Sequence, residues 1–110
     1  MRATIDVAEL TGIFSVRWRV SCRLEFTAIE LAAIRFAKLD DRTVYERQSQ
    51  TGDVSRSLKQ ARDQGFGWEF DFPLAALSES IRIETEILPT IKSWLDAAQS
   101  FKTGSRTIEL

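Results

Sequence analysis

The clearest pattern in the chain is a strict alternation of apolar and polar residues over residues 14–26. The apolar positions are Phe14, Val16, Trp18, Val20, Cys22, Leu24 and Phe26. A period of two is typical of a β-strand with one buried and one solvated face. Residues 3–7 alternate in the same way and are followed by a turn at 9–12, so we expect a hairpin of two antiparallel strands.

The strand predicted over residues 14–26 is long for a chain of 110 residues. At ~3.3 Å per residue it would extend about 43 Å. A globular domain of this length has a diameter of only about 35 Å. We therefore expect the strand to coil, to contain a bulge, or to protrude and meet a partner.

A second alternating run covers residues 66–72, where every apolar position is aromatic. The outward side of this run is acidic, whereas the outward side of residues 14–26 is basic. If the two strands are neighbours, opposite charges meet across the sheet and help to fix its register. We call the residues involved the charged sheet face: Arg17, Arg19, Arg23, Glu69 and Asp71. This face is the binding surface that the sequence predicts.

A helix is predicted to begin where the first long strand ends. Thr27 and Glu30 have the spacing of a capping box, in which each side chain binds the backbone N–H of the other residue. Residues 28–39 are rich in helix formers. The expected inner stripe of this helix is Ile29, Ala32, Ala33 and Phe36. Further apolar residues widen that stripe, so we expect the helix to be well buried.

The longest helical pattern runs from about residue 79 to residue 101. Its apolar residues recur at spacings of three and four: Ile87, Ile91, Trp94, Leu95, Ala98 and Phe101. Pro89 lacks an N–H and collides with the preceding turn, so we expect either a kink there or a helix that starts near Thr85. The acidic residues expected on its solvated face are Glu79, Glu84 and Glu86.

The rest of the chain has weaker patterns. Residues 43–48 predict a short strand, and residues 106–110 predict a closing strand. Two alternatives stay open for residues 49–64: a mobile loop, or a short helix that ends at Gly65. In the helical alternative, the inner face comprises Val54, Leu58 and Ala61.

These elements predict one α+β domain over residues 1–110. We expect a twisted antiparallel sheet of four to five strands with two main helices packed on one face, because the two clearest strands are each apolar on one side only. The content of 44% hydrophobic and 28% charged residues is ordinary for a globular protein. No stretch approaches the ~18 apolar residues of a transmembrane helix, so we expect no membrane contact.

Catalytic and cofactor-binding residues are sparse. The chain has no histidine and one cysteine, so zinc, haem and iron–sulfur sites are not expected. Gly65 and Gly67 lack the third glycine of a dinucleotide-binding turn. Cys22, on the apolar side of its strand, is expected to be an inert buried thiol, and a lone cysteine favours the reducing cytoplasm. We therefore predict no enzyme, no cofactor and no metal. Carboxylates that act with Mg²⁺ or Ca²⁺ are the catalytic alternative.

Charge is unevenly distributed along the chain. Residues 1–62 carry 11 basic and 8 acidic side chains and residues 63–110 carry 4 and 8, which gives +3 and −4 and the total of −1. We predict a non-catalytic protein-interaction module that binds another protein or itself as a homodimer. By analogy of size, it is an accessory or inhibitor protein of a bacterium or phage.

The alternative function is nucleic-acid binding, with phosphates held by Arg17, Arg19 and Arg23. Against this alternative, the aromatic residues of the same strand lie on the opposite face. Bases that contact the arginines therefore cannot stack on aromatic rings beside them.

Overall fold

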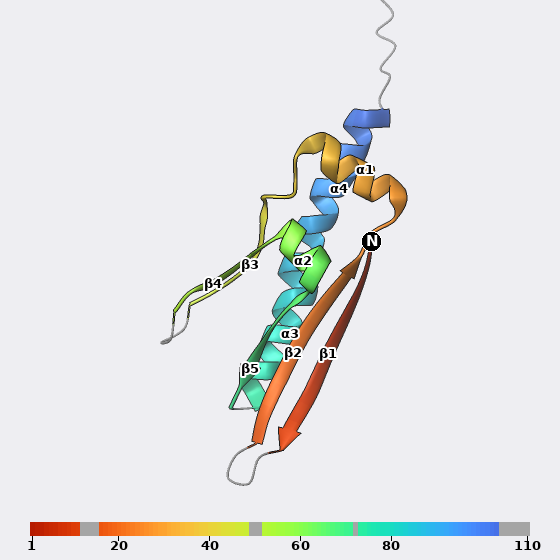
Figure 1. Cartoon of the computed structure of the whole chain (residues 1–110). Coiled ribbons are helices and arrows are strands. Elements are labelled where there is room, and N and C mark those ends of the chain that lie inside the picture. The colour runs from red at the N-terminus through yellow and green to blue at the C-terminus, as the bar shows by residue number, and fades with distance from the viewer. Residues whose placement is uncertain (12–15, 49–51, 72, 104–110) are drawn as a thin grey trace, which may run out of the picture.

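The N-terminal hairpin and a long C-terminal helix lie along each other and form the body of the molecule (Figure 1). β1 (Arg2–Thr11) pairs with β2 (Val16–Glu25), and β2 pairs with β5 (Phe66–Phe70), both antiparallel. The first sheet therefore has the order β1-β2-β5. The computed structural model describes residues 1–11, 16–48, 52–71 and 73–103.

The alternation in the sequence becomes the two faces of this sheet. Val20, Cys22 and Leu24 are buried, whereas the arginines between and before them are exposed. The predicted hairpin is confirmed. Thr11 and Val16 form its last described pair. The turn expected at residues 9–12 is wrong for residues 9–11, which belong to β1 and pair with residues 16–18. Residue 12, Phe14 and Phe72 lie outside the described residues.

β5 approaches β2 closely because a glycine stands at their contact. Gly67 lies opposite Ser21, and a Cβ atom on Gly67 would be 2.3 Å from the carbonyl oxygen of Val20. No side chain fits in that space without moving one strand away from the other. The position of β5 beside β2 therefore depends on the absence of a side chain at residue 67.

The other two strands form a separate sheet, so the expected single sheet of four to five strands is wrong. β3 (Thr43–Arg47) pairs antiparallel with β4 (Val54–Ser57), and this two-stranded hairpin projects from the body (Figure 1). β4 runs directly into α2 (Leu58–Gln64), and Ser57 caps that helix through a capping box with Gln60. α2 follows β4 without a loop, and among the described strands it is β5, after α2, that pairs with the second side of β2.

Neither alternative for residues 49–64 is fully correct. Val54 lies on a strand, whereas Leu58 and Ala61 are buried on a helix, as the helical alternative expected. Gly65 ends α2 with a φ of 71°, in the left-handed region that glycine tolerates. Residues 49–51 and the predicted closing strand at 106–110 lie outside the described residues.

The C-terminal helix is longer than predicted and accommodates its proline in an unexpected way. α3 (Pro73–Arg82), the π-helical turn η1 (Ile83–Ile87) and α4 (Leu88–Thr103) follow one another without a break. The wide π turn, closed by the Leu88 N–H on the Ile83 carbonyl, lies immediately before Pro89. Proline has no N–H and cannot fit over a regular preceding turn. The π turn relieves this conflict, so the helix does not start near Thr85.

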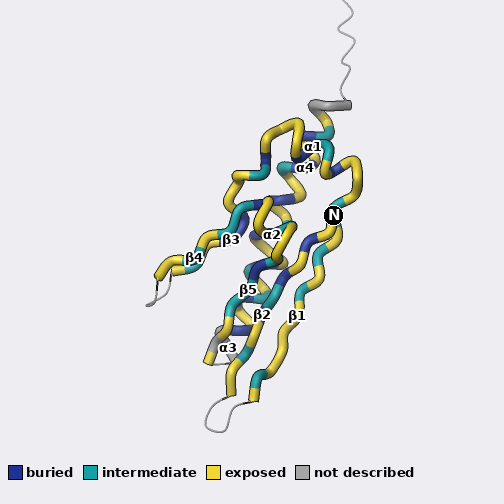
Figure 2. Tube along the Cα trace, in the orientation of Figure 1, coloured by how far each residue is buried: buried dark blue, intermediate teal, exposed yellow. Residues whose placement is uncertain are grey.

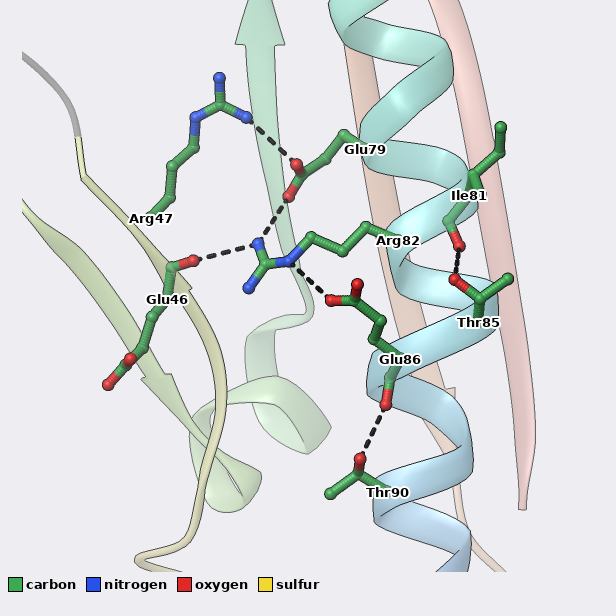
Figure 3. Close-up of polar contacts among 8 residues, drawn as sticks. All are labelled: Glu46, Arg47, Glu79, Ile81, Arg82, Thr85, Glu86 and Thr90. Atoms are coloured by element: carbon green, nitrogen blue, oxygen red, sulfur yellow. Dashed lines mark hydrogen bonds and ion pairs between the residues drawn. The ribbon is translucent and has the colours of Figure 1, made fainter.

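Two threonine hydroxyls also bind carbonyl groups around this turn (Figure 3). Thr85 donates to the carbonyl of Ile81, and Thr90 donates to the carbonyl of Glu86, both at 2.7 Å. Hydroxyls that bind the carbonyl four residues earlier commonly accompany bent or irregular helices.

α1 (Ala28–Ala37) forms as predicted but packs differently. The capping box of Thr27 and Glu30 is present, and Lys38 ends the helix with a φ of 54°. The main packing partner of α1 is α4. Its buried residues are Glu30, Ala33 and Ile34. The expectation of a well-buried helix is therefore wrong.

The core lies between the first sheet and the C-terminal helix, with α2 against β2 (Figure 2). α3 covers the apolar face of β1, β2 and β5. One main helix therefore covers this sheet, where two were expected. Within the described ranges, every helix is too short or too polar to span a lipid bilayer.

Candidate binding surfaces

The charged sheet face forms where β2 and β5 run side by side. Arg19 lies directly opposite Glu69 in the register, and its Nη2 donates to Glu69 Oε1 at 2.8 Å. Arg17 donates from Nε to Asp71 Oδ1 at 3.1 Å and lies 3.8 Å from Glu69. The pairing expected for Arg17 and Arg19 is therefore present.

These pairs are solvated. The hydrogen bond from Arg19 lowers the pKa of the Glu69 carboxyl, although both side chains are about half exposed. Water and salt screen such pairs strongly. Arg17 and Arg19 are partly neutralised by their own neighbours, which leaves less positive charge for an external phosphate.

Arg23 is separated from this group. Within the described part of the chain it has no carboxylate within salt-bridge distance. It lines a polar cleft of about 620 Å³ between β2 and the β4–α2 segment. The polar side chains on the cleft walls are Thr4, Asp6, Ser21, Arg23, Arg56 and Gln64. The structure thus divides the predicted arginine stripe into a paired part and a part that faces a cleft.

A second group of charges fastens the β3–β4 hairpin to the C-terminal helix (Figure 3). Glu79 on α3 accepts from Arg47 of β3 at 3.2 Å and from Arg82 at 3.4 Å. Arg82 also donates to the Glu46 carbonyl at 3.1 Å and lies 3.4 Å from Glu86. Glu79 is buried, so its expected place on the solvated face of the helix is wrong.

Aromatic rings surround this group of charges. The Arg47 guanidinium lies 5.2 Å from the ring centre of Trp68, and that of Arg82 lies 5.6 Å from the ring centre of Tyr45. Such cation–π contacts add to the ion pairs. Burial and the negative charge of Glu79 raise the pKa of the Tyr45 hydroxyl, so it stays protonated. The arrangement joins the β3–β4 hairpin to α3, and Glu46, Arg47 and Arg82 also line a shallow hollow of about 430 Å³ beside the hairpin.

The sequence contains a signal that would have identified Glu79. Ala76, Glu79, Ile83 and Ile87 recur at spacings of three and four, and all four are buried. A carboxylate within such a stripe needs a buried partner, and arginine is the side chain best suited to that role.

Apolar residues are exposed on α1. The exposed fraction is 66% for Ile29 and 53% for Phe36, and half-buried Ala32 lies between them at helical spacing. Beside Phe36, a hollow of about 420 Å³ opens between α1 and α4, and it is also lined by Leu39 and Trp94. We call Ile29, Ala32 and Phe36 the α1 strip.

Two further observations concern the lone thiol and the acidic side chains. Burial raises the pKa of the Cys22 thiol to about 11, so the thiol is protonated at neutral pH. Among the described residues, no three acidic, cysteine or histidine side chains gather in a group that could hold a metal ion.

Comparisons of this chain with known proteins identify no family to which it is similar. The chain matches no protein-family model, and no curated protein or solved structure is significantly similar to it.

Proposed function

We propose that this chain is a protein-binding module that acts by association and not by catalysis, and that the α1 strip is its contact surface. The observation that carries the proposal is the exposure of Ile29 and Phe36 on a helix that is otherwise firmly formed. Large apolar side chains that gather on one exposed face mark a protein contact more often than isolated ones do. The partner is expected to be another protein that presents an apolar segment.

The hollow beside the α1 strip supports this choice. Phe36 of α1, Trp94 of α4 and Leu39 just after α1 line it, so an apolar side chain of a partner can insert between them. Aromatic residues around a small pocket are the usual centre of a protein interface. The expected cytoplasmic setting, which rests on the lone cysteine, belongs to the same proposal.

The test compares proteins captured from a lysate by the parent chain and by the double variant Ile29→Glu/Phe36→Lys. Each new charge suits the helix dipole at its end of α1, and the net charge is unchanged, so folding should be kept. The matched control is Leu31→Gln, an exposed residue outside the strip. Capture of a specific protein that the double variant loses and the control keeps supports the proposal. Equal capture by all three proteins, or no capture by the parent, contradicts it.

Nucleic-acid binding is the second candidate function, and one observation favours it. Arg23 and Arg56 line the same cleft, and within the described residues neither is ion-paired to a carboxylate. Binding of a labelled oligonucleotide should then weaken steeply with salt. It should be lost in Arg23→Glu/Arg56→Glu but kept in Arg17→Glu/Arg19→Glu. Binding that does not depend on salt would exclude this candidate.

A further inference from the structure

The outer side of β1 is an open sheet edge. β1 is ten residues long and pairs with β2 on one side, and none of the described residues pairs with its other side. An open edge presents a row of backbone donors and acceptors that another strand can bind. Proteins commonly block such edges with lysine, proline or a bulge. Residues 2–11 contain neither lysine nor proline, their pairing with β2 has no bulge, and their charged residues, Arg2, Asp6 and Glu9, are of both signs.

Apolar side chains lie along this open edge. Val7 is 45% exposed on the side of β1 that faces the C-terminal helix. Leu77 and Ile81, on consecutive turns of α3, are 57% and 50% exposed. Figure 3 shows Ile81 on the side of the helix away from the β3–β4 hairpin, and α3 packs against β1. A strand added to β1 would therefore approach an apolar flank as well as open backbone groups.

The first residues of β1 are complementary to themselves in the antiparallel direction. With Thr4 opposite Thr4 of a second copy, Arg2 lies opposite Asp6 and Ala3 lies opposite Ile5. Each of these pairs occurs twice by symmetry, so two opposite-charge pairs and two apolar pairs form together. Arg2 binds Glu25 within its own chain and retains further donors for the carboxylate of the second copy.

Other registers are less favourable. Moving the centre by one residue shifts the second strand by two residues. Such shifts keep the apolar faces of both strands on the same side of the sheet. Centring on Asp6 puts two carboxylates opposite each other, and centring on Val7 puts Glu9 opposite Ile5. Centring on Ile5 leaves Arg2 opposite Ala8. The pairing centred on Thr4 is the one that places opposite charges directly across from each other.

We propose that a second copy of this chain adds its β1 to the open edge of β1, antiparallel and centred on Thr4, which makes one continuous six-stranded sheet from the three strands of each copy. The surface is separate from the α1 strip, so the dimer and the binding of another protein can be tested independently. The two-fold axis passes through Thr4, and the charge pairs between Arg2 and Asp6 lie on both sides of it.

Charge exchange tests the pairing. Arg2→Asp places two carboxylates at each contact, and Asp6→Arg places two arginines there, so each variant alone should dimerise about tenfold more weakly than the parent. An equimolar mixture of the two variants restores both opposite-charge pairs and should form a heterodimer. Both residues are exposed, so the variants should fold. Native mass spectrometry distinguishes the species, because a chain of 12.5 kDa gives a dimer of about 25 kDa.

A symmetric disulfide tests the register. Thr4→Cys puts two thiols on the two-fold axis, where Cβ atoms of opposite residues are about 4.5–5.5 Å apart, near disulfide range. Mild oxidation should therefore link this variant into a covalent dimer. The parent chain is the control, because its Cys22 is buried and should stay reduced.

Three outcomes overturn the proposal. The parent chain could be a monomer at every concentration tested. The variants Arg2→Asp and Asp6→Arg could dimerise as strongly alone as in the mixture, which would place the interface elsewhere. Finally, Ile5→Cys could form the disulfide in place of Thr4→Cys, which would refute the register centred on Thr4.

Discussion

Two groups of arginine–carboxylate pairs hold strands in this protein, and they differ in burial more than in distance. Glu69 lies 2.8 Å from Arg19, and Glu79 lies 3.2 Å from Arg47. The Glu69 side chain is 42% exposed, whereas that of Glu79 is 9% exposed. Water screens the first group, and the second group lies against aromatic rings. Contact distance alone is therefore a poor guide to which pairs stabilise the fold.

The two groups also have different structural tasks. β5 is already joined to β2 by backbone hydrogen bonds and by the close approach at Gly67. The ion pairs of Glu69 therefore only add to contacts that hold β5 without them. The β3–β4 hairpin has no sheet partner among the described strands. The contacts of Glu79 join this hairpin to α3 (Figure 3). Losing Glu79 should therefore release an element, whereas losing Glu69 should not.

The largest expected effect is that of Glu79→Gln. It removes the buried negative charge that faces Arg47 and Arg82, and breaking a buried pair typically costs ~3–5 kcal/mol. Because both arginines are partly exposed, we expect a loss of about 2–3 kcal/mol in the free energy of unfolding. Denaturation in urea measures the loss, and hydrogen exchange should show weaker protection in β3 than in β2.

The matched control for this variant is Glu84→Gln, an exposed carboxylate on the same helix. It should change the free energy of unfolding by less than ~0.5 kcal/mol. If both variants lose the same stability, burial does not distinguish the two groups of pairs.

The second-largest loss of stability is expected from Gly67→Ala, which tests which contacts hold β5 beside β2. The added methyl group would meet the Val20 carbonyl, so β5 has to move away from β2. We expect a loss of roughly 1–3 kcal/mol, as for other overpacked sites. Ser21→Ala, at the opposite position on β2, is the control and should cost much less. A Gly67→Ala variant as stable as the parent would mean that the exposed ion pairs hold β5 after all.

Local sequence signals predicted much of this fold. The alternation around Val20 and Phe66 identified β2 and β5, and Thr27 with Glu30 identified the start of α1. These signals depend on residues that are close in the sequence, so they predict the same element whichever elements pack against it. The pairing of Arg17 and Arg19 with Glu69 and Asp71 was predicted for the same reason, because strand residues alternate between faces, but the separation of Arg23 from this group was not.

Features that depend on distant contacts were not predicted. The sequence does not say which helix will meet α1, so the exposure of Ile29 and Phe36 was missed. Glu79 was assigned to the solvated face because its partner Arg47 is far away in the chain. β3 and β4 pair with each other in a separate sheet, and neither strand carries a local signal that it stays apart from β2.

A smaller effect is expected from Glu30, whose burial resembles that of Glu79. Burial alone would raise the pKa of its carboxyl, but hydrogen bonds from the N-terminal ammonium group and from Thr27 outweigh it and lower the pKa. The ordinary pKa of about 4.3 in the unfolded chain is therefore higher than the pKa in the folded protein. The stabilisation is complete above that value and is lost as the pH falls through the folded pKa.

Glu30→Gln tests this reasoning. At neutral pH the variant should lose about 1 kcal/mol, the usual value of a helix cap. Below about pH 4 the difference between the variant and the parent should shrink, since the parent carboxyl is then protonated. Denaturation curves at pH 7 and pH 3 measure both values. A difference that grows on acidification would mean that the folded pKa of Glu30 lies above its ordinary value.

The smallest effect is expected from the exposed pair of Arg19 and Glu69, and a double-mutant cycle isolates it. Arg19→Ala and Glu69→Ala each remove the same contact, so the sum of their separate losses should exceed the loss of the double variant by the energy of the pair, which for exposed side chains is below about 1 kcal/mol. Any remaining coupling should disappear in 1 M salt, where charges are screened within about 3 Å. The corresponding cycle for Arg82 and Glu79 should retain its coupling in the same salt. Equal coupling and equal salt dependence in both cycles would contradict the idea that burial separates these two groups of ion pairs.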